Sequence, residues 1–157
     1  MPEPLFHWPA PGLLVLSAAR LGLAGLLGAL LGVQRERVHK AAGLRTHVLV
    51  GLGSALFVLA EVESGADAAA ISRVVQGVVA GIGFLGAGTI LKIGDRVEVH
   101  GLTTAASIWV TAAVGVAAGM GHVWLAAVAT VLGWVALGPL WRYERHLRTD
   151  EPPPGNR

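Results

Sequence analysis

The residues of this chain that could do chemistry are polar side chains that gather at one end of several apolar segments. They offer guanidinium, carboxylate, imidazole and hydroxyl groups, which form ion pairs and hydrogen bonds or line a path for a hydrated ion. No nucleophile among them has a recognisable base, so we do not expect an enzyme. The set comprises Arg35, Glu36, Arg45, Thr46, His47, Thr89, Thr103, Thr104, Ser107 and Thr111.

The spacing of these residues allows two interpretations. Thr103, Ser107 and Thr111 follow one another at intervals of four, which places them on one face of a helix. Such a stripe in a lipid-embedded helix should face protein or water, so it could line a cavity or a partner surface on the cytoplasmic side. The hydroxyls could equally bond back to carbonyls four residues earlier or join neighbouring helices.

Three charged residues of this set predict an ion-pair network. We expect Arg35, Glu36 and Arg45 to close the cytoplasmic mouth of the protein, with Thr104 and Ser107 behind them. The alternative is a basic loop at the lipid headgroups in which Glu36 is merely solvated. No arrangement of Asp, Glu or His has a clear metal-ligand spacing, so a bound Mg²⁺ is compatible with the sequence but not indicated by it, and no cofactor is expected.

A lone arginine lies inside the first apolar segment. Arg20 is about two turns from the end opposite to the polar set, and Glu61 lies at a matching depth in the second segment. A central arginine costs about 2.5–3.5 kcal/mol on insertion scales, so a partner is expected. We predict an intramembrane Arg20–Glu61 ion pair, with snorkelling of Arg20 to the headgroups as the alternative.

Five apolar segments must position these side chains. A membrane helix needs about 20 mostly apolar residues, and 54% of the chain is hydrophobic while only 14% is charged. We therefore predict an all-α integral membrane bundle of about five transmembrane helices. The second segment is the weakest and could be a tilted short helix or a re-entrant loop. The segments cover about 13–33, 44–60, 71–91, 102–119 and 123–141.

The distribution of charge predicts the orientation of the bundle. Ten of the 12 Lys and Arg fall on one side of the predicted membrane, and Glu61, Glu63 and Asp67 fall on the other. Basic loops stay in the cytoplasm, so the N-terminus should be outside and the C-terminus inside. Residues 1–12 should be an extended lead-in, 13–148 the transmembrane domain and 149–157 a disordered tail. The basic groups lie next to hydrophobic ends, which favours contact with a lipid bilayer over nucleic acid.

Glycine is the remaining signal in the sequence. Small residues at intervals of four let membrane helices approach closely, and segment 71–91 is so rich in Gly that we predict it at the centre of the bundle. Its G-x-G-x-x-G pattern lacks the strand and the acidic residue of a dinucleotide site, although the glycines could let the helix unwind around an ion. The predicted packing glycines are Gly28, Gly32, Gly77, Gly81, Gly83, Gly86, Gly88, Gly115 and Gly119.

Three blocks of the sequence resemble the transmembrane domain of the MgtC/SapB family. They read AGLRTH, GIGFLGAGTI and GLTTAASIWVTAAVG, within a likeness that covers about Arg20 to Gly119. The resemblance implies a multi-pass protein of the bacterial cell inner membrane that is associated with adaptation to low magnesium. Some family members are linked to survival inside host cells and to restraint of the F-type ATP synthase. Better-studied members carry a C-terminal ACT-like domain, which we do not expect in this chain. Their virulence representatives have Asn in place of His47 and Cys in place of Val110.

Two functions follow from the residues and the resemblance together. We expect a non-enzymatic regulator that binds other inner-membrane proteins and forms a homo-oligomer, with a dimer as the simplest form. The alternative is a transporter or channel for magnesium or another cation. That alternative would have to use carbonyls, hydroxyls and hydrated ions, because no Asp or Glu lies in the middle of a predicted span.

Overall fold

The part of the chain that the structure describes forms a bundle of five helices, as the sequence predicts. The computed structural model describes residues 10–92, 99–140 and 143. Four helices are long and apolar enough to cross a membrane, and α5 is a shorter apolar helix. The second predicted segment is one continuous helix, so the re-entrant alternative is wrong. The helices are α1 (Pro11–Arg37), α2 (Leu44–Glu63), α3 (Ala68–Ala87), α4 (Leu102–Gly119) and α5 (Val123–Leu137).

Local signals in the sequence fix where several helices begin. Pro11 occupies the first turn of α1, where its missing N–H is not needed. The helix therefore starts two residues before the expected boundary of the lead-in. The Asp67 side chain caps α3 by accepting a hydrogen bond from the Ala70 amide at 2.7 Å. Gly101, with φ of +99°, supplies the left-handed conformation that precedes α4.

The segment after α3 differs from the prediction. We expected helix as far as Leu91, but α3 ends at Ala87, and β1 (Leu91–Lys92) pairs antiparallel with β2 (Val99–His100). Gly86 and Gly88 are weak helix formers. The Thr89 hydroxyl also donates to the Gly86 carbonyl at 2.8 Å, which favours a turn over another helical turn.

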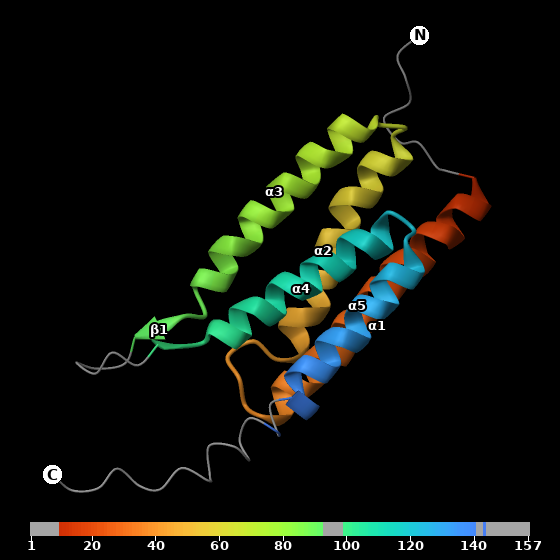
Figure 1. The fold of residues 1–157 in the computed structure, drawn as a ribbon. Helices are drawn as coiled ribbons and strands as arrows, with labels where there is room; N and C mark the ends of the chain where they lie inside the picture. Colours follow the sequence, from red (N-terminus) through yellow and green to blue (C-terminus); the bar gives the residue numbers. More distant parts are fainter. Residues whose placement is uncertain (1–9, 93–98, 141–142, 144–157) are drawn as a thin grey trace, which may run out of the picture.

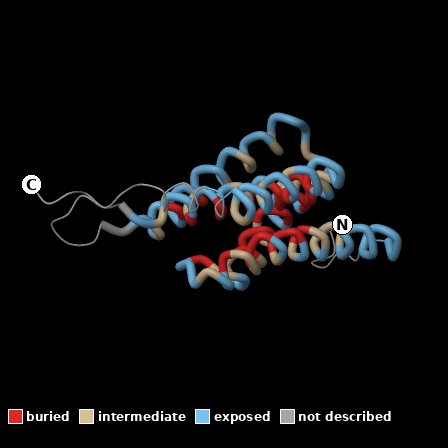
Figure 2. The backbone as a smooth tube through the Cα atoms, turned by 60° about the horizontal axis from the view of Figure 1, so that its bottom comes forward, coloured by how far each residue is buried: buried red, intermediate tan, exposed pale blue. Residues whose placement is uncertain are grey.

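The centre of the bundle is α4, not α3 (Figure 1). Helix α4 packs against α1, α2, α3 and α5, whereas the main contacts of α3 are with α4 and α2. In an 18-residue apolar stretch of α4, 50% of the residues are buried, whereas 6% are buried in the corresponding stretch of α3. Figure 2 shows the buried residues concentrated where α1, α2 and α4 meet, and α3 largely exposed. The prediction that segment 71–91 forms the centre is wrong.

Glycines allow the backbones of α1, α2 and α4 to touch. A Cβ at Gly28 would lie 2.5 Å from the His47 carbonyl oxygen, and one at Gly119 would lie 2.6 Å from that of Ala55. A Cβ at Gly32 would lie 2.8 Å from the Leu44 Cα, and one at Gly115 would clash with the Gly51 carbonyl. These four positions have no room for a side chain, as expected of close helix packing in lipid.

The glycines of α3 are placed differently. A Cβ at Gly77, Gly81 or Gly83 would meet nothing within 4 Å, and one at Gly86 would make an ordinary 3.5 Å contact with Ala105. Gly88 lies at the end of the helix, where its nearest neighbours are carbonyls of α3 itself. The prediction that these glycines of α3 pack the bundle is therefore wrong within one chain, because none of them is in close contact with another helix.

The helix ends fall into two groups at opposite ends of the bundle (Figure 1), as the predicted basic and acidic sides imply. The C-terminal ends of α1, α3 and α5 lie with the N-terminal ends of α2 and α4 at one end of the bundle (Figure 1). The α2–α3 and α4–α5 turns lie at the opposite end. Which end faces the cytoplasm stays a prediction from the charges. Residues 1–9, most of the basic C-terminal region and the expected tail at 149–157 lie outside the described residues.

Candidate functional site

A buried polar cluster lies where α1, α2 and α4 meet. It comprises Arg35 from α1, His47 from α2, and Thr104, Ser107 and Thr111 from α4. Each of these residues is at most 4% exposed, and His47 and Thr111 are 0% exposed. Burying polar groups is costly unless they are hydrogen-bonded, so the contacts of this cluster decide what it can do.

Arg35 is the charged member of the cluster. Its Nη2 donates to the Thr104 hydroxyl oxygen at 2.6 Å, which ties the last turn of α1 to the first turn of α4. The Arg35 Nε and the neighbouring Gln34 Oε1 are also buried, and neither has a hydrogen-bond partner among the described residues. Arg35 is thus held by a neutral partner and keeps unused donor capacity inside the protein.

His47 links the start of α2 to α4. Its Nδ1 lies 2.8 Å from the Gly43 carbonyl oxygen and its Nε2 lies 3.2 Å from the Ser107 hydroxyl. A carbonyl only accepts hydrogen bonds, so Nδ1 carries a proton. In the neutral ring, Nε2 can then only accept a hydrogen bond. The Ser107 hydroxyl has one hydrogen, which it donates either to this nitrogen or to the Thr104 carbonyl oxygen at 2.7 Å.

The hydroxyls of α4 follow the second sequence-based interpretation, since they bond back to helix carbonyls and join neighbouring helices. Ser107 and Thr111 donate to carbonyls three and four residues earlier, and Ser107 also contacts the His47 ring. The buried face differs by one position from the expected stripe. Thr103 is exposed, and Thr104 takes its place with Ser107 and Thr111. Thr104, Ser107 and Thr111 are spaced by three and four residues, so they share a helix face just as the expected set with Thr103 would. The hydrogen bond from Arg35 to Thr104 explains why this face is the buried one.

The predicted Arg35–Glu36–Arg45 network does not form. Glu36 is exposed, and its Oε2 accepts from the Leu44 amide at 3.0 Å, so it caps the N-terminus of α2. A carboxylate at this position satisfies a free N–H and complements the helix dipole, which explains its preference for the backbone. Arg35 is turned inward to Thr104, Arg45 is exposed, and no ion pair joins the three among the described residues.

The predicted Arg20–Glu61 pair is also absent from the described part of the chain. Arg20 Nη1 instead lies 3.4 Å from the carbonyl of Gly119, at the C-terminal end of α4. The last carbonyls of a helix lack partners and carry partial negative charge, so they offer a guanidinium a site without a carboxylate. At the same end of the bundle, Ser17 donates to Glu63.

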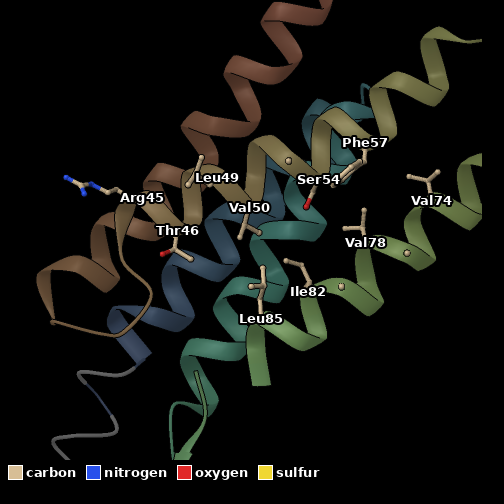
Figure 3. A pocket seen from close by; sticks show the side chains of 13 residues that line it. Arg45, Thr46, Leu49, Val50, Ser54, Phe57, Val74, Val78, Ile82 and Leu85 are labelled. Carbon is tan, nitrogen blue, oxygen red and sulfur yellow. The ribbon is translucent and has the colours of Figure 1, made fainter. Parts of the chain in front are cut away.

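The remaining predicted residues lie apart from the buried polar cluster. Thr46 and Arg45 line the end of a groove of about 840 Å³ between α2 and α3, whereas Thr89 bonds to Gly86 just beyond α3. Figure 3 shows the groove, with Val50 and Ser54 on one wall and Val78 and Ile82 on the other. Sequence reasoning missed this groove, although Gly53, Gly77 and Gly81, which have no side chains to fill it, were a usable signal.

Together, the four long apolar helices and the buried polar cluster define a polytopic helical membrane protein. The MgtC family model matches residues 21–146, so the chain belongs to the MgtC family. That match contains the three blocks on which the sequence-based resemblance depends, and the resemblance is confirmed.

Several curated proteins are similar to this chain. Protein SrpB of Synechococcus elongatus is 45% identical over 80% of this chain and 75% of its own length. Protein MgtC of Brucella abortus (strain 2308) is 50% identical over 73% of this chain and 47% of its own length. An Escherichia coli K12 protein named "Putative magnesium transporter YhiD" is 42% identical over 75% of this chain and 57% of its own length. This chain therefore spans three quarters of SrpB but only about half of the MgtC and YhiD proteins. No solved structure matches it.

Proposed function

We propose that this protein is a non-enzymatic regulator of the bacterial inner membrane, which acts in adaptation to low magnesium by binding another membrane protein. The observation that carries the proposal is the charge of the buried polar cluster. Arg35 is 4% exposed and its partner Thr104 is neutral, so the cluster is cationic. At an effective dielectric constant of about 20, a Mg²⁺ ion about 6 Å from this guanidinium meets a repulsion on the order of 5 kcal/mol.

The packing of the central helices supports the same conclusion. The α1–α2 and α2–α4 contacts are backbone against backbone at Gly28 and Gly115. A path for a hydrated ion between these helices would require their separation. The buried polar cluster is better suited to hold α1, α2 and α4 in one arrangement, while the outer helices remain available to a partner.

The outer face of α3 is the surface we assign to partner binding. Phe84 is 81% exposed, and Gly83 beside it has open space at its Cβ position. A bulky aromatic side chain next to a glycine gives a membrane helix both a protrusion and a point of close approach. Self-association into a homodimer, which the sequence also predicts, would use the same face.

A test in cells separates binding from stability. We expect Phe84→Ala to abolish growth support in low magnesium, in a strain that depends on this protein, while membrane abundance and thermal stability stay at the wild-type level. Leu132→Ala is the matched control, because Leu132 is a similarly exposed apolar residue on α5. Growth support by Phe84→Ala equal to that of the control would contradict the assignment of α3.

Cation transport is the second candidate, and the name of the YhiD relative favours it. A magnesium path would have to avoid the cationic cluster and run between subunits, with carbonyls, hydroxyls and water as ligands. In this case the cation is cargo, and the protein needs no resident metal.

A further inference from the structure

The groove between α2 and α3 has the polarity of a phospholipid. Its lining is apolar over most of its length, and its polar residues are mainly Arg45 and Thr46 at one end (Figure 3). Arg45 follows the N-terminus of α2, and its side chain extends away from the apolar lining, as expected of a residue at headgroup depth (Figure 3).

The charge at this end is free to bind an anion. Arg45 is exposed and makes no ion pair within the described residues. The nearby carboxylate of Glu36 is engaged with the Leu44 amide instead. Basic groups at the ends of membrane helices attract anionic lipid headgroups, and a guanidinium matches the geometry of a phosphate.

The length of the groove suits one acyl chain. The α2 stretch from Arg45 to Phe57, both of which line the groove, runs about 18 Å at a helical rise of about 1.5 Å per residue. The hydrocarbon core of a bilayer is about 30 Å thick, so this stretch is slightly longer than one leaflet is deep. Gly53, Gly77 and Gly81 leave the space along it open.

We propose that this groove is a specific site for an anionic phospholipid, with the phosphate at Arg45 and Thr46 and an acyl chain between α2 and α3. The site is independent of the regulatory role proposed above. It would make the spacing of α2 and α3 depend on the lipid composition of the leaflet that Arg45 faces.

Retention of lipid by the purified full chain tests the headgroup contact. The protein is exchanged into detergent with phosphatidylglycerol or phosphatidylcholine, and bound lipid is counted by native mass spectrometry. We expect Arg45→Gln to lower phosphatidylglycerol retention about fivefold, the effect of one basic residue worth about 1 kcal/mol near a membrane surface. Arg45→Lys should keep most of the binding. Arg37→Gln, which removes an exposed arginine outside the groove, should leave it unchanged.

The acyl-chain contact has its own matched pair of variants. Gly81→Leu places a side chain in the groove, and Gly83→Leu places one on α3 outside it; neither Cβ meets a neighbour within 4 Å, so both should fold. We expect Gly81→Leu to reduce retention of both lipids and Gly83→Leu to leave it unchanged. Equal losses from Arg45→Gln and Arg37→Gln, or wild-type retention by Gly81→Leu, would overturn the proposal. A dimer that Gly81→Leu dissociates without loss of lipid would assign the groove to a second copy and would also overturn it.

Discussion

At the scale of single residues, the contact between Arg35 and Thr104 is the central interaction of the buried polar cluster. A buried guanidinium without a carboxylate is unusual, and it is tolerated here because Nη2 reaches a hydroxyl at 2.6 Å. Removing the acceptor alone leaves a buried charge without its partner, which costs more than the hydrogen bond contributes when both partners are present.

Substitution of the hydroxyl measures this cost. We expect Thr104→Val to lower the free energy of unfolding by about 1–2 kcal/mol in detergent or bicelles. Thr103→Val, at the exposed neighbouring position, should change it by less than about 0.5 kcal/mol. In an Arg35→Met background the effect of Thr104→Val should shrink, because the unpaired charge is gone. An unchanged effect in that background would show that Arg35 is not what Thr104 stabilises.

The His47 ring allows a second prediction at this scale. Since the Gly43 carbonyl can only accept, the neutral ring should be protonated at Nδ1. Nitrogen-15 chemical shifts of the labelled imidazole report which nitrogen carries the proton. We expect the Nδ1–H tautomer in the wild type. A ring protonated only at Nε2 would mean that the contact with Gly43 is absent in the membrane.

At the scale of elements, the sequence defines the helices well and their arrangement poorly. Apolar length locates all five helices to within about four residues of their bounds. The start signals Pro11 and Asp67 were present in the sequence but were not used to place the beginnings of α1 and α3. The same glycine richness that placed α3 at the centre does not reveal which side of α3 the glycines face. In lipid, apolar side chains are favourable both inside and outside the bundle, so hydrophobicity gives no direction.

The candidate site was predictable to a similar degree. The sequence marks His47, Thr104, Ser107 and Thr111 as polar residues at one depth, but helical spacing alone led us to expect Thr103 on the polar face of α4 in place of Thr104. It does not reveal that Glu36 and Arg20 choose backbone partners, Leu44 and Gly119, over charged side chains. Those partners are unpaired groups at helix ends, which become available only when the helices pack.

Two glycine substitutions test the arrangement of the elements. We expect Gly115→Ala to lower the free energy of unfolding by about 1–3 kcal/mol, because its Cβ would meet the carbonyl of Gly51 across the α2–α4 contact. Gly77→Ala, on α3, should be neutral or stabilising by up to about 1 kcal/mol, since its position is open and alanine is the better helix former. If Gly77→Ala lowered the free energy of unfolding as much as Gly115→Ala does, α3 would have to lie in the core.

At the scale of the whole molecule, the bundle separates basic and acidic ends. The chain contains no cysteine, so single cysteines can be introduced as unique labels. With an impermeant thiol reagent on intact spheroplasts, we expect Glu63→Cys to react and Arg37→Cys to react only after the membrane is opened. Both positions are exposed and lie at opposite ends of the bundle. Labelling of Arg37→Cys in intact spheroplasts would invert the predicted orientation.

Our central proposal is that the cationic interior of this MgtC-family protein serves packing and regulation and does not conduct Mg²⁺. The most direct measurement is magnesium flux into liposomes that contain the pure protein, followed with an entrapped magnesium-sensitive dye. We predict that magnesium enters liposomes with the wild-type protein no faster than it enters empty vesicles. Arg35→Met, which removes the repulsive charge, should give the same rate. A wild-type flux above that of empty vesicles that saturates with magnesium concentration would contradict the account.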